Sequence, residues 1–466
     1  MDKKQLVEAE SVNKIKTGSF ERRLALTRIG LMAGTRVAGQ VAVSMFSNKK
    51  KRVEKRKTAV SEQAVFIAKE LGKLKGSVVK IGQVMALYGE HFLPPEVTEA
   101  LHTLEENTIA LDWSVIRGVL YEQLGTEAMS QLDIEHEPIG SASLGQVHRA
   151  TITTTGEVIC LKVQYPGVAN SIDVDLNAVA QILKLAKMVT FGQAFDEWLV
   201  EVRVMMHREV DYKLEARTTE HFRALLADDP HFVVPKVYPD FSTAQVLATS
   251  YEVGENVSSP KVACLSQQRR NKLSKLSLLI FLKELFVWHE IQTDPNFGNY
   301  RIRIDNLGEE DKIVLLDFGA VQKYPASFID PVCNMICSAF INDLDGVVEG
   351  GIALKIMHTD WPKKVLTEFA QICIAVLEPL AISRSTEFSE AFNERGEYCW
   401  KESDLPTRIA KRAAKSAINR YFKIPPKEFV FLNRKLVGVY TFISVLGGQF
   451  NGRELLIPFI NGYKKD

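Results

Sequence analysis

Two stretches of the chain have the apolar pattern of β-strands. In Glu157–Val163 apolar and polar residues alternate directly after Gly156, and this pattern predicts a strand entered through a hairpin turn. Lys312–Leu316 is a short apolar run and predicts a buried strand. Charged residues accompany both strands: Lys162 lies within the first, and Asp317 follows the second.

Three longer stretches have the spacing of apolar residues that is typical of helices. We expect helices over Leu24–Phe46, Trp198–Leu226 and Leu273–His289. The second of these carries Asp211 and Glu215, which are four residues apart and therefore share one helix face. That acidic face is either simply solvated or holds a partner for a lysine elsewhere in the chain.

The composition excludes several classes of protein. The chain has 466 residues and a net charge of +1, so it gives no case for nucleic-acid binding through a global positive field. Its six cysteines are too few for a disulfide framework, and no C-x-x-C pair indicates a structural zinc site. The beginning of the chain lacks the apolar core of a secretory signal.

The longest apolar stretches are Gly30–Phe46 and Leu436–Gly447. Both are shorter than the roughly twenty residues that span a bilayer, so we predict no transmembrane helix. The first is followed by Lys49–Lys57, which holds seven basic residues and one acid. An apolar helix beside a basic run suits an anionic membrane surface, although a core helix followed by a solvated linker gives the same pattern.

Four short motifs in one order indicate a nucleotide site. The first is Ile139–Val147, which approximates the kinase loop G-x-G-x-x-G-x-V with alanine at the middle glycine. Small residues let backbone N–H groups approach phosphate oxygens. Gln146 stands where a P-loop needs lysine, so a P-loop is rejected, and an ordinary tight turn is the alternative. The loop residues that we expect to bind the nucleotide are Gly140, Ser141, Ala142, Ser143, Gly145 and Val147.

The second motif is Lys162 in its predicted strand. A lysine there either extends from a strand edge to solvent or reaches the phosphates of a nucleotide. In the second case it needs a glutamate to hold it, and Glu215 is the candidate.

The third and fourth motifs supply oxygen ligands and a base. Asp294 and Asn299 have the spacing D-x-x-x-x-N of a kinase catalytic loop, and Asp317 begins Asp-Phe-Gly. We expect Asp317 and Asn299 to bind Mg²⁺ and Asp294 to accept a hydroxyl proton or orient a nucleophile. Asp-Pro-Asn is also common in turns, but the order of all four motifs favours the kinase interpretation.

With these motifs the chain resembles the UbiB-type atypical kinase family, whose members support ubiquinone (coenzyme Q) biosynthesis. Lys80–Gln83 resembles the family's K-x-G-Q motif, which ordinary protein kinases lack, and Glu209–Asp211 resembles its E-x-D motif. Lys162–Val168 and Gln292–Asn296 are most similar to the coenzyme Q8-type subgroup.

The resemblance implies an α+β, protein kinase-like, two-lobed fold with an N-terminal helical extension over the nucleotide cleft. Lys80 and Gln83 would enter the active site near Glu209 and Asp211 and exclude peptide substrates. No Ala-Pro-Glu motif follows Asp317 to dock a peptide. The family's loop is alanine-rich where this chain begins with Gly140, so the resemblance leaves a preference between ATP and ADP open.

On this basis we expect four segments. They are an extension and basic linker (1–57), a helical extension (58–135), a small lobe (136–256) and a helical large lobe (257–466). Ser250–Gly254 would be the hinge, where Glu252 and its backbone neighbours could contact adenine.

The expected activity is that of an ATP-dependent atypical kinase or ATPase, using ATP or ADP and Mg²⁺. Its partners would be an anionic membrane surface or a quinone lipid, and coenzyme Q biosynthesis proteins. The resemblance places it peripherally on the cytoplasmic side of a membrane, or on the mitochondrial matrix side in a eukaryote. A protein-directed kinase and a pseudokinase scaffold are the alternatives.

Overall fold

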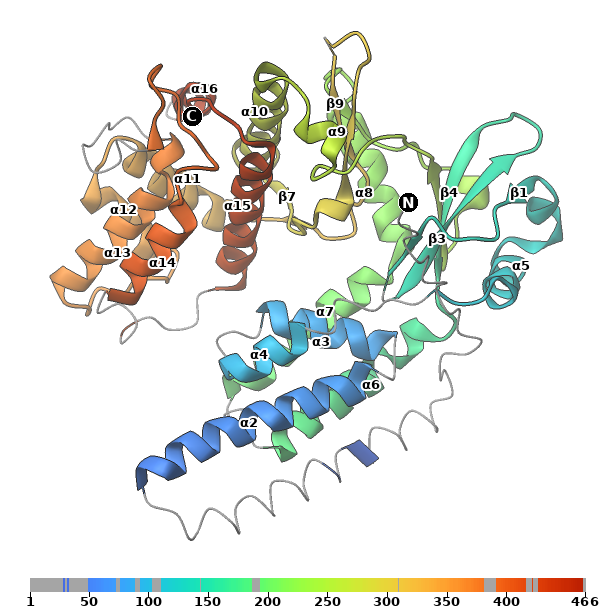
Figure 1. Cartoon of the computed structure of the whole chain (residues 1–466), viewed down its shortest axis with the longest axis horizontal. Helices are drawn as coiled ribbons and strands as arrows, with labels where there is room; N and C mark the ends of the chain where they lie inside the picture. Colours follow the sequence, from blue (N-terminus) through green and yellow to red (C-terminus); the bar gives the residue numbers. More distant parts are fainter. Residues whose placement is uncertain are drawn as a thin grey trace, which may run out of the picture. The chain divides into compact units, whose positions relative to one another are not determined.

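The computed structural model (Figure 1) describes most of the chain. The described residues are 28–29, 32, 49–72, 76–88, 93–102, 110–142, 144–186, 193–308, 310–380, 391–415, 421 and 426–463. They divide into two compact units. Unit 1 comprises the described residues up to Arg217 together with Lys236–Tyr251, and unit 2 comprises Thr218–Pro235 and the described residues from Glu252 onward.

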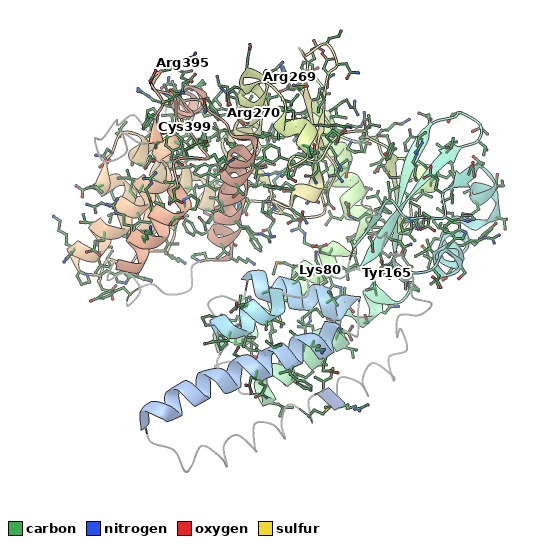
Figure 2. All side chains as sticks on the ribbon, in the orientation of Figure 1. Lys80, Tyr165, Arg269, Arg270, Arg395 and Cys399 are labelled. Atoms are coloured by element: carbon green, nitrogen blue, oxygen red, sulfur yellow. The ribbon has the colours of Figure 1, made fainter. Side chains whose placement is uncertain are left out.

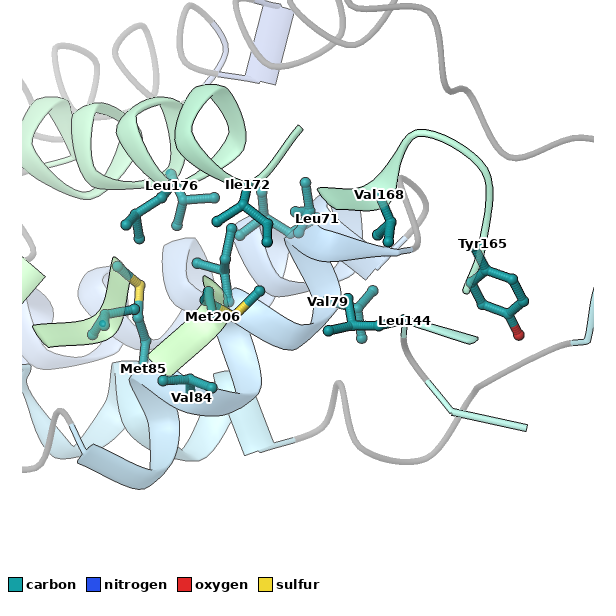
Figure 3. Close-up of a cluster of buried hydrophobic side chains, with 14 of the residues drawn as sticks. Leu71, Val79, Val84, Met85, Leu144, Tyr165, Val168, Ile172, Leu176 and Met206 are labelled. Carbon is teal, nitrogen blue, oxygen red and sulfur yellow. The ribbon is translucent and has the colours of Figure 1, made fainter. Parts of the chain in front are cut away.

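Helices make up one part of unit 1. They are α2 (Lys49–Gly72), α3 (Ser77–Tyr88), α4 (Pro95–His102), α5 (Trp113–Ser130), α6 (Val168–Leu185) and α7 (Gln193–Glu209). Helix α3 packs against α2, α4, α6 and α7. Figure 3 shows the shared core, where Met85 of α3, Ile172 of α6 and Met206 of α7 are fully buried. Each such side chain stabilises the fold by about 1.5–3 kcal/mol.

A buried polar contact also fixes α3 to α6. The Ser77 hydroxyl, at the first residue of α3, donates to a carboxylate oxygen of the fully buried Asp175 and contacts the Ser171 hydroxyl at 2.7 Å. A buried carboxylate needs such partners, because an unpaired one is costly. The contact therefore helps to set the position of α3, which carries Lys80.

The basic run Lys49–Lys57 was expected to form a linker, and the structure gives it a helical backbone. The run forms the first turns of α2. Lysine, arginine and glutamate are good helix formers, and the run contains neither glycine nor proline. The predicted helix Leu24–Phe46 lies outside the described residues except for Arg28, Ile29 and Met32.

The sheet of unit 1 is antiparallel. Its strands are β1 (Leu132–Ile134), β2 (Gly140–Ser141), β3 (Gly145–Ile152), β4 (Val158–Gln164) and β6 (Val246–Ser250), in the order β1-β3-β4-β6 with β2 pairing with β3. The predicted hairpin joins β3 to β4, and Gly156 in its turn has a φ of 74°, which favours glycine. Ile159, Leu161 and Val163 alternate along β4 and are fully buried.

The helix predicted over Trp198–Leu226 is two helices. α7 ends at Glu209 and α8 (Tyr212–Leu225) begins after a break. The Asp211 carboxylate accepts the Leu214 N–H at 2.9 Å and so starts α8 as its N-cap. The Gln164 amide donates to the Val210 carbonyl at 2.6 Å, which stabilises the break from the side of β4.

Unit 2 combines two small sheets with helices. β5 (Phe232–Val233), β9 (Lys312–Leu315) and β8 (Tyr300–Arg303) form one sheet in that order, and β7 (Glu290–Gln292) pairs with β10 (Val321–Lys323). The helices are α9 (Pro260–Ala263), α10 (Gln267–Lys283), α11 (Ala326–Phe340), α12 (Leu344–Ala353), α13 (Lys363–Val376), α14 (Leu405–Lys415), α15 (Lys427–Leu446) and α16 (Arg453–Tyr463).

The loop that joins β8 to β9 is fixed to α10. The guanidinium of Arg269, labelled in Figure 2, donates to the buried Asp311 carboxylate through Nε at 2.7 Å and also through Nη2. Both carboxylate oxygens are used, which is the strong bidentate form of this contact. The contact holds β9 in place, and Asp317 lies two residues beyond the end of that strand.

One described helix, α15, is long and apolar enough to cross a membrane by length and composition. It begins nine residues earlier than the apolar stretch that the sequence showed, at Lys427 rather than Leu436. Its buried residues include Phe442 and Ile443 in the core of unit 2, and Lys435, which pairs with the buried Glu284 at 3.0 Å. These contacts are typical of the core helix of a globular unit.

Candidate active-site residues

The predicted phosphate loop is a tight hairpin in unit 1. Gly140–Ser141 pairs with β3 as strand β2. The Ala142 N–H donates to the Gly145 carbonyl at 2.8 Å and closes the turn. Ser143 lies outside the described residues.

Gly145 is a position in this loop where only glycine fits. A Cβ there would lie 2.4 Å from the Val163 carbonyl oxygen and 3.0 Å from the Tyr212 hydroxyl. At Gly140, by contrast, a Cβ would meet no atom within 4 Å. The close approach of Gly145 therefore fixes the loop against β4 and the start of α8.

The position that a P-loop reserves for lysine faces the interior. Gln146 is 1% exposed, and its amide accepts the Leu111 N–H at 2.8 Å and donates to the Leu111 carbonyl at 3.2 Å. It also contacts the His148 ring at 2.8 Å. The side chain anchors the segment before α5 and does not face a ligand, in line with the rejection of a P-loop.

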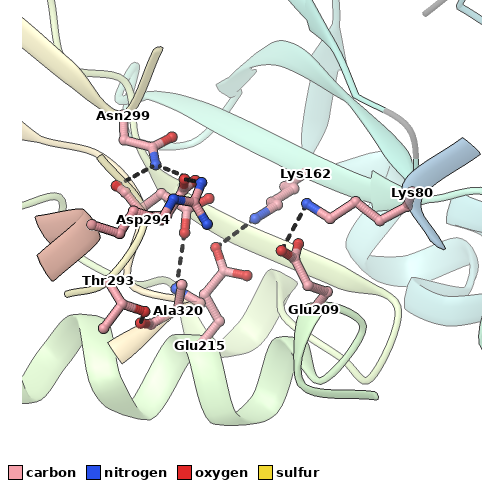
Figure 4. A network of polar contacts seen from close by, with 11 residues as sticks. Lys80, Lys162, Glu209, Glu215, Thr293, Asp294, Asn299 and Ala320 are labelled. Atoms are coloured by element: carbon pink, nitrogen blue, oxygen red, sulfur yellow. Dashed lines mark hydrogen bonds and ion pairs between the residues drawn. The ribbon is translucent and has the colours of Figure 1, made fainter. Parts of the chain in front are cut away.

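Lys162 and Glu215 form an ion pair within unit 1 (Figure 4). Lys162 lies on β4 opposite Val147, and its ammonium donates to the Glu215 carboxylate at 2.6 Å. It also lies 5.2 Å from the centre of the Tyr212 ring. Because Glu215 is buried in the first turn of α8, the pair fixes the ammonium at a defined position. The structure thus brings together the two residues that the sequence paired.

Lys80 extends from α3 to the end of α7. Its ammonium pairs with the Glu209 carboxylate at 2.7 Å, also seen in Figure 4. Asp211 lies two residues later and caps α8. Gln83 lies on α3, half-buried, three residues after Lys80. The K-x-G-Q and E-x-D motifs therefore meet through their first residues.

The predicted hinge has no regular secondary structure after β6, over residues 251–254. The Glu252 side chain pairs with Arg303. A Cβ at Gly254 would lie 2.7 Å from the Arg301 Cβ, so the backbone runs close to β8. Because the Glu252 side chain is engaged by Arg303, any contact of this residue with a nucleotide would be made by its backbone. The predicted role of Glu252 stays a prediction.

In unit 2 the residues of the predicted catalytic loop contact one another. The loop begins after β7, where the Thr293 hydroxyl donates to the Ala320 carbonyl at 2.7 Å. The Asn299 amide donates to the Asp294 carboxylate at 2.9 Å. The other carboxylate oxygen of Asp294 accepts from Arg434 of α15 at 3.1 Å. Asp294 is therefore held from both sides.

Asp317 occupies the turn after β9. Its carboxylate accepts the Gly319 N–H at 2.9 Å. The Leu316 N–H donates to the Asn299 carbonyl at 2.9 Å, so the backbone ties the Asp317 segment to the catalytic loop. Phe318 is buried and packs against Phe222, with 4.9 Å between ring centres.

The donor set of these loops fits a magnesium ion. A carboxylate only accepts hydrogen bonds, so Asn299 must turn its amide nitrogen toward Asp294 and its oxygen away. That oxygen and the Asp317 carboxylate are the hard ligands that Mg²⁺ prefers, and Mg²⁺ takes its other ligands from water and phosphates. Within the described residues no group of three or more His, Cys, Asp or Glu side chains forms a metal site.

Sequence reasoning missed Arg434 and the ion pair of Glu284 with Lys435. Glu284 lies in the π-helical turn after α10 and also accepts a long hydrogen bond from the Gln292 N–H, at 3.5 Å. Burial raises the pKa of Glu284, although Lys435 opposes this shift. Burial alone would lower the pKa of Lys435. The nearby Glu284 and Tyr300 together have the larger effect, so the pKa of Lys435 is raised. These contacts join positions about 140–150 residues apart, and no local motif signals them.

This chain is similar to known proteins of an atypical kinase family. The family model of the ABC1 atypical kinase-like domain matches residues 103–350. The chain is 29% identical to the Danio rerio "Atypical kinase COQ8B, mitochondrial", over 97% of this chain and 71% of that protein. It is 28% identical to the Saccharomyces cerevisiae "Atypical kinase COQ8, mitochondrial", over 84% and 74%.

Among solved structures, one similar chain is that of the Mycobacterium tuberculosis Rv3197–erythromycin complex. It is 22% identical to this chain, with a TM-score of 0.57, and the match covers 90% of this chain and 99% of that one. That likeness concerns the fold alone. Together with the family model it confirms the predicted kinase-like α+β fold class, and because the model matches more than half of the residues, the chain belongs to the ABC1 atypical kinase-like family.

Proposed function

We propose that this protein is an atypical kinase or ATPase that uses ATP or ADP with Mg²⁺ and supports coenzyme Q biosynthesis at a membrane. The observation that carries the proposal is the ion pair between Lys162 and Glu215. A strand lysine held by a helix glutamate is the device with which kinases position nucleotide phosphates. It lies inside the part of the chain that matches the family model.

Each residue has a chemical task in this proposal. Lys162 binds phosphate oxygens, while Gly145 lets the loop backbone come close to them. Asp317 and Asn299 hold the magnesium ion, which when bound neutralises charge that develops on the transferred phosphoryl group. Asp294, held by Asn299 and Arg434, orients the attacking hydroxyl or water and accepts its proton.

The proposed pathway, coenzyme Q biosynthesis, is inferred from the similar proteins. Proteins named COQ8 and COQ8B are similar to this chain over most of its length, and the UbiB-type resemblance implies quinone lipid synthesis. Their names also place them in mitochondria, so we propose peripheral membrane association on the mitochondrial matrix side if the source is a eukaryote, and on the cytoplasmic side otherwise. Coenzyme Q biosynthesis proteins are the proposed partners.

The test is nucleotide turnover by the full chain, with and without anionic liposomes, with the product identified as free phosphate or as a phosphorylated molecule. Asp317→Asn removes the proposed metal ligand charge and should abolish the thermal stabilisation by ATP and Mg²⁺. Asp360→Asn is the matched control, because Asp360 is an exposed aspartate of the same unit. It should leave that stabilisation unchanged.

Three outcomes would contradict the proposal. An unchanged magnesium-dependent stabilisation of Asp317→Asn would remove the metal assignment. Rapid phosphorylation of added peptides would favour a protein-directed kinase, since we propose that Lys80 and Gln83 exclude peptides. Nucleotide binding without turnover under every condition would favour a pseudokinase scaffold.

A further inference from the structure

Unit 2 contains a cavity of about 120 Å³ that the proposed chemistry does not use. Most of its wall is built by α10, α11, α13 and α15, which can be followed in Figure 1. Leu282, Met335, Val376 and Leu432 are typical of the residues that line it. Among the described lining residues none carries a formal charge, and Asn433 is the one with a polar amide.

The apolar lining of the cavity determines which class of ligand it can bind. A cavity lined by hydrocarbon stays dry and takes up apolar molecules, and an engineered apolar cavity of about 150 Å³ binds benzene. A ring bearing several oxygen atoms would lose hydrogen bonds to water here and find few partners. An aliphatic chain makes no hydrogen bonds to water and therefore loses none when it enters the cavity. The cavity volume matches part of such a chain, and because the cavity is only partly enclosed, the remainder would extend beyond it.

The sulfur in the wall supports this assignment. Cys373 lies in the cavity wall, and burial raises the pKa of its thiol to about 12. At neutral pH the thiol is therefore uncharged and behaves as a small apolar group. The wall thus presents neither charge nor a strong nucleophile to its occupant.

We propose that this cavity binds the end of an aliphatic chain, such as a polyprenyl or acyl tail. The residues that line the cavity include none of the proposed nucleotide and metal residues, and the proposal does not rest on the proposed enzymatic activity. Binding to it can be measured without any nucleotide.

The experiment uses calorimetric titration of the purified full chain with a series of linear alcohols from butanol to dodecanol. Each added methylene inside the cavity should raise affinity about fourfold. The gain should stop at the length that fills the cavity, because further methylenes remain in water. Nonspecific partitioning, by contrast, would continue to rise with chain length.

Two neighbouring positions on α15 give matched variants. Leu436 lines the cavity, whereas the side chain of Val437 is exposed and does not. Leu436→Trp should fill the space and weaken octanol binding at least tenfold. Val437→Trp should leave it unchanged, and Leu436→Ala should move the plateau to a longer alcohol.

Absence of saturable alcohol binding to the folded wild type would overturn the proposal. The proposal would also be overturned if affinity rose with alcohol length without a plateau, and to the same extent in the wild type and in Leu436→Trp. If Leu436→Trp does not fold, the proposed site is tested instead by photolabelling of the wild type with a diazirine-bearing octanol. Labels on peptides of α10, α11, α13 or α15 are expected, and labels confined to other segments would contradict the site.

Discussion

At the scale of single residues, Lys162 has both a structural and a proposed binding role, and the two can be separated. Lys162→Ala leaves the buried Glu215 carboxylate without its 2.6 Å partner. Loss of that partner should lower the free energy of unfolding by about 1–3 kcal/mol. Nucleotide affinity should fall too, because the ammonium that we propose binds the phosphates is gone.

The double variant Lys162→Met with Glu215→Gln distinguishes the two roles. It removes both charges together, so urea unfolding should show most of the lost stability restored. Calorimetric titration with ATP and Mg²⁺ should still show weakened binding. If the double variant regained wild-type nucleotide affinity along with its stability, Lys162 would be a structural residue of β4 and nothing more.

At the scale of elements, the break between α7 and α8 is set by Asp211, and capping can be tested apart from charge. Asp211→Ala removes the acceptor for the Leu214 N–H and should lower the free energy of unfolding by about 1 kcal/mol. Asp211→Asn keeps a good cap and removes only the charge, so its stability in urea should equal the wild type's. A change of turnover in Asp211→Asn at unchanged stability would support the predicted role of Asp211 in regulating the site. Equal destabilisation by both substitutions would contradict the capping interpretation.

The same elements show what a single sequence can predict. The β3–β4 hairpin and the strand that precedes Asp317 were predicted correctly, because alternation, apolar runs and a turn glycine are local signals. The division of Trp198–Leu226 into α7 and α8 was missed. Its causes are a side-chain cap and a hydrogen bond from Gln164 to Val210, and the second joins residues far apart in the sequence. Lys162 and Glu215 were paired because a kinase strand lysine needs a helix glutamate, whereas Arg434 belongs to no motif and its contact with Asp294 is visible only in the fold.

At the scale of the whole molecule, the basic run Lys49–Lys57 forms the N-terminal end of a helix. This position favours the hypothesis that the run binds an anionic membrane surface. Cations at the N-terminus of a helix interact unfavourably with its dipole, and the first turn of α2 contains no acidic residue. An anionic membrane surface would relieve this repulsion. We therefore expect the run to contribute to vesicle binding, by about 1 kcal/mol for each basic residue near the surface.

The test replaces Lys49, Lys50, Lys51 and Arg52 with glutamine, which preserves helix propensity. Four such residues amount to about 4 kcal/mol, so co-sedimentation with anionic vesicles at low salt should weaken by up to roughly a thousandfold. The difference should shrink as salt shortens the screening length. The matched control changes four lysines that are exposed in unit 2, namely Lys363, Lys364, Lys401 and Lys411. Both variants lose the same charge, so an equal loss of vesicle binding would point to net charge alone. No loss in either variant, at any salt concentration, would leave the run as a solvated end of α2.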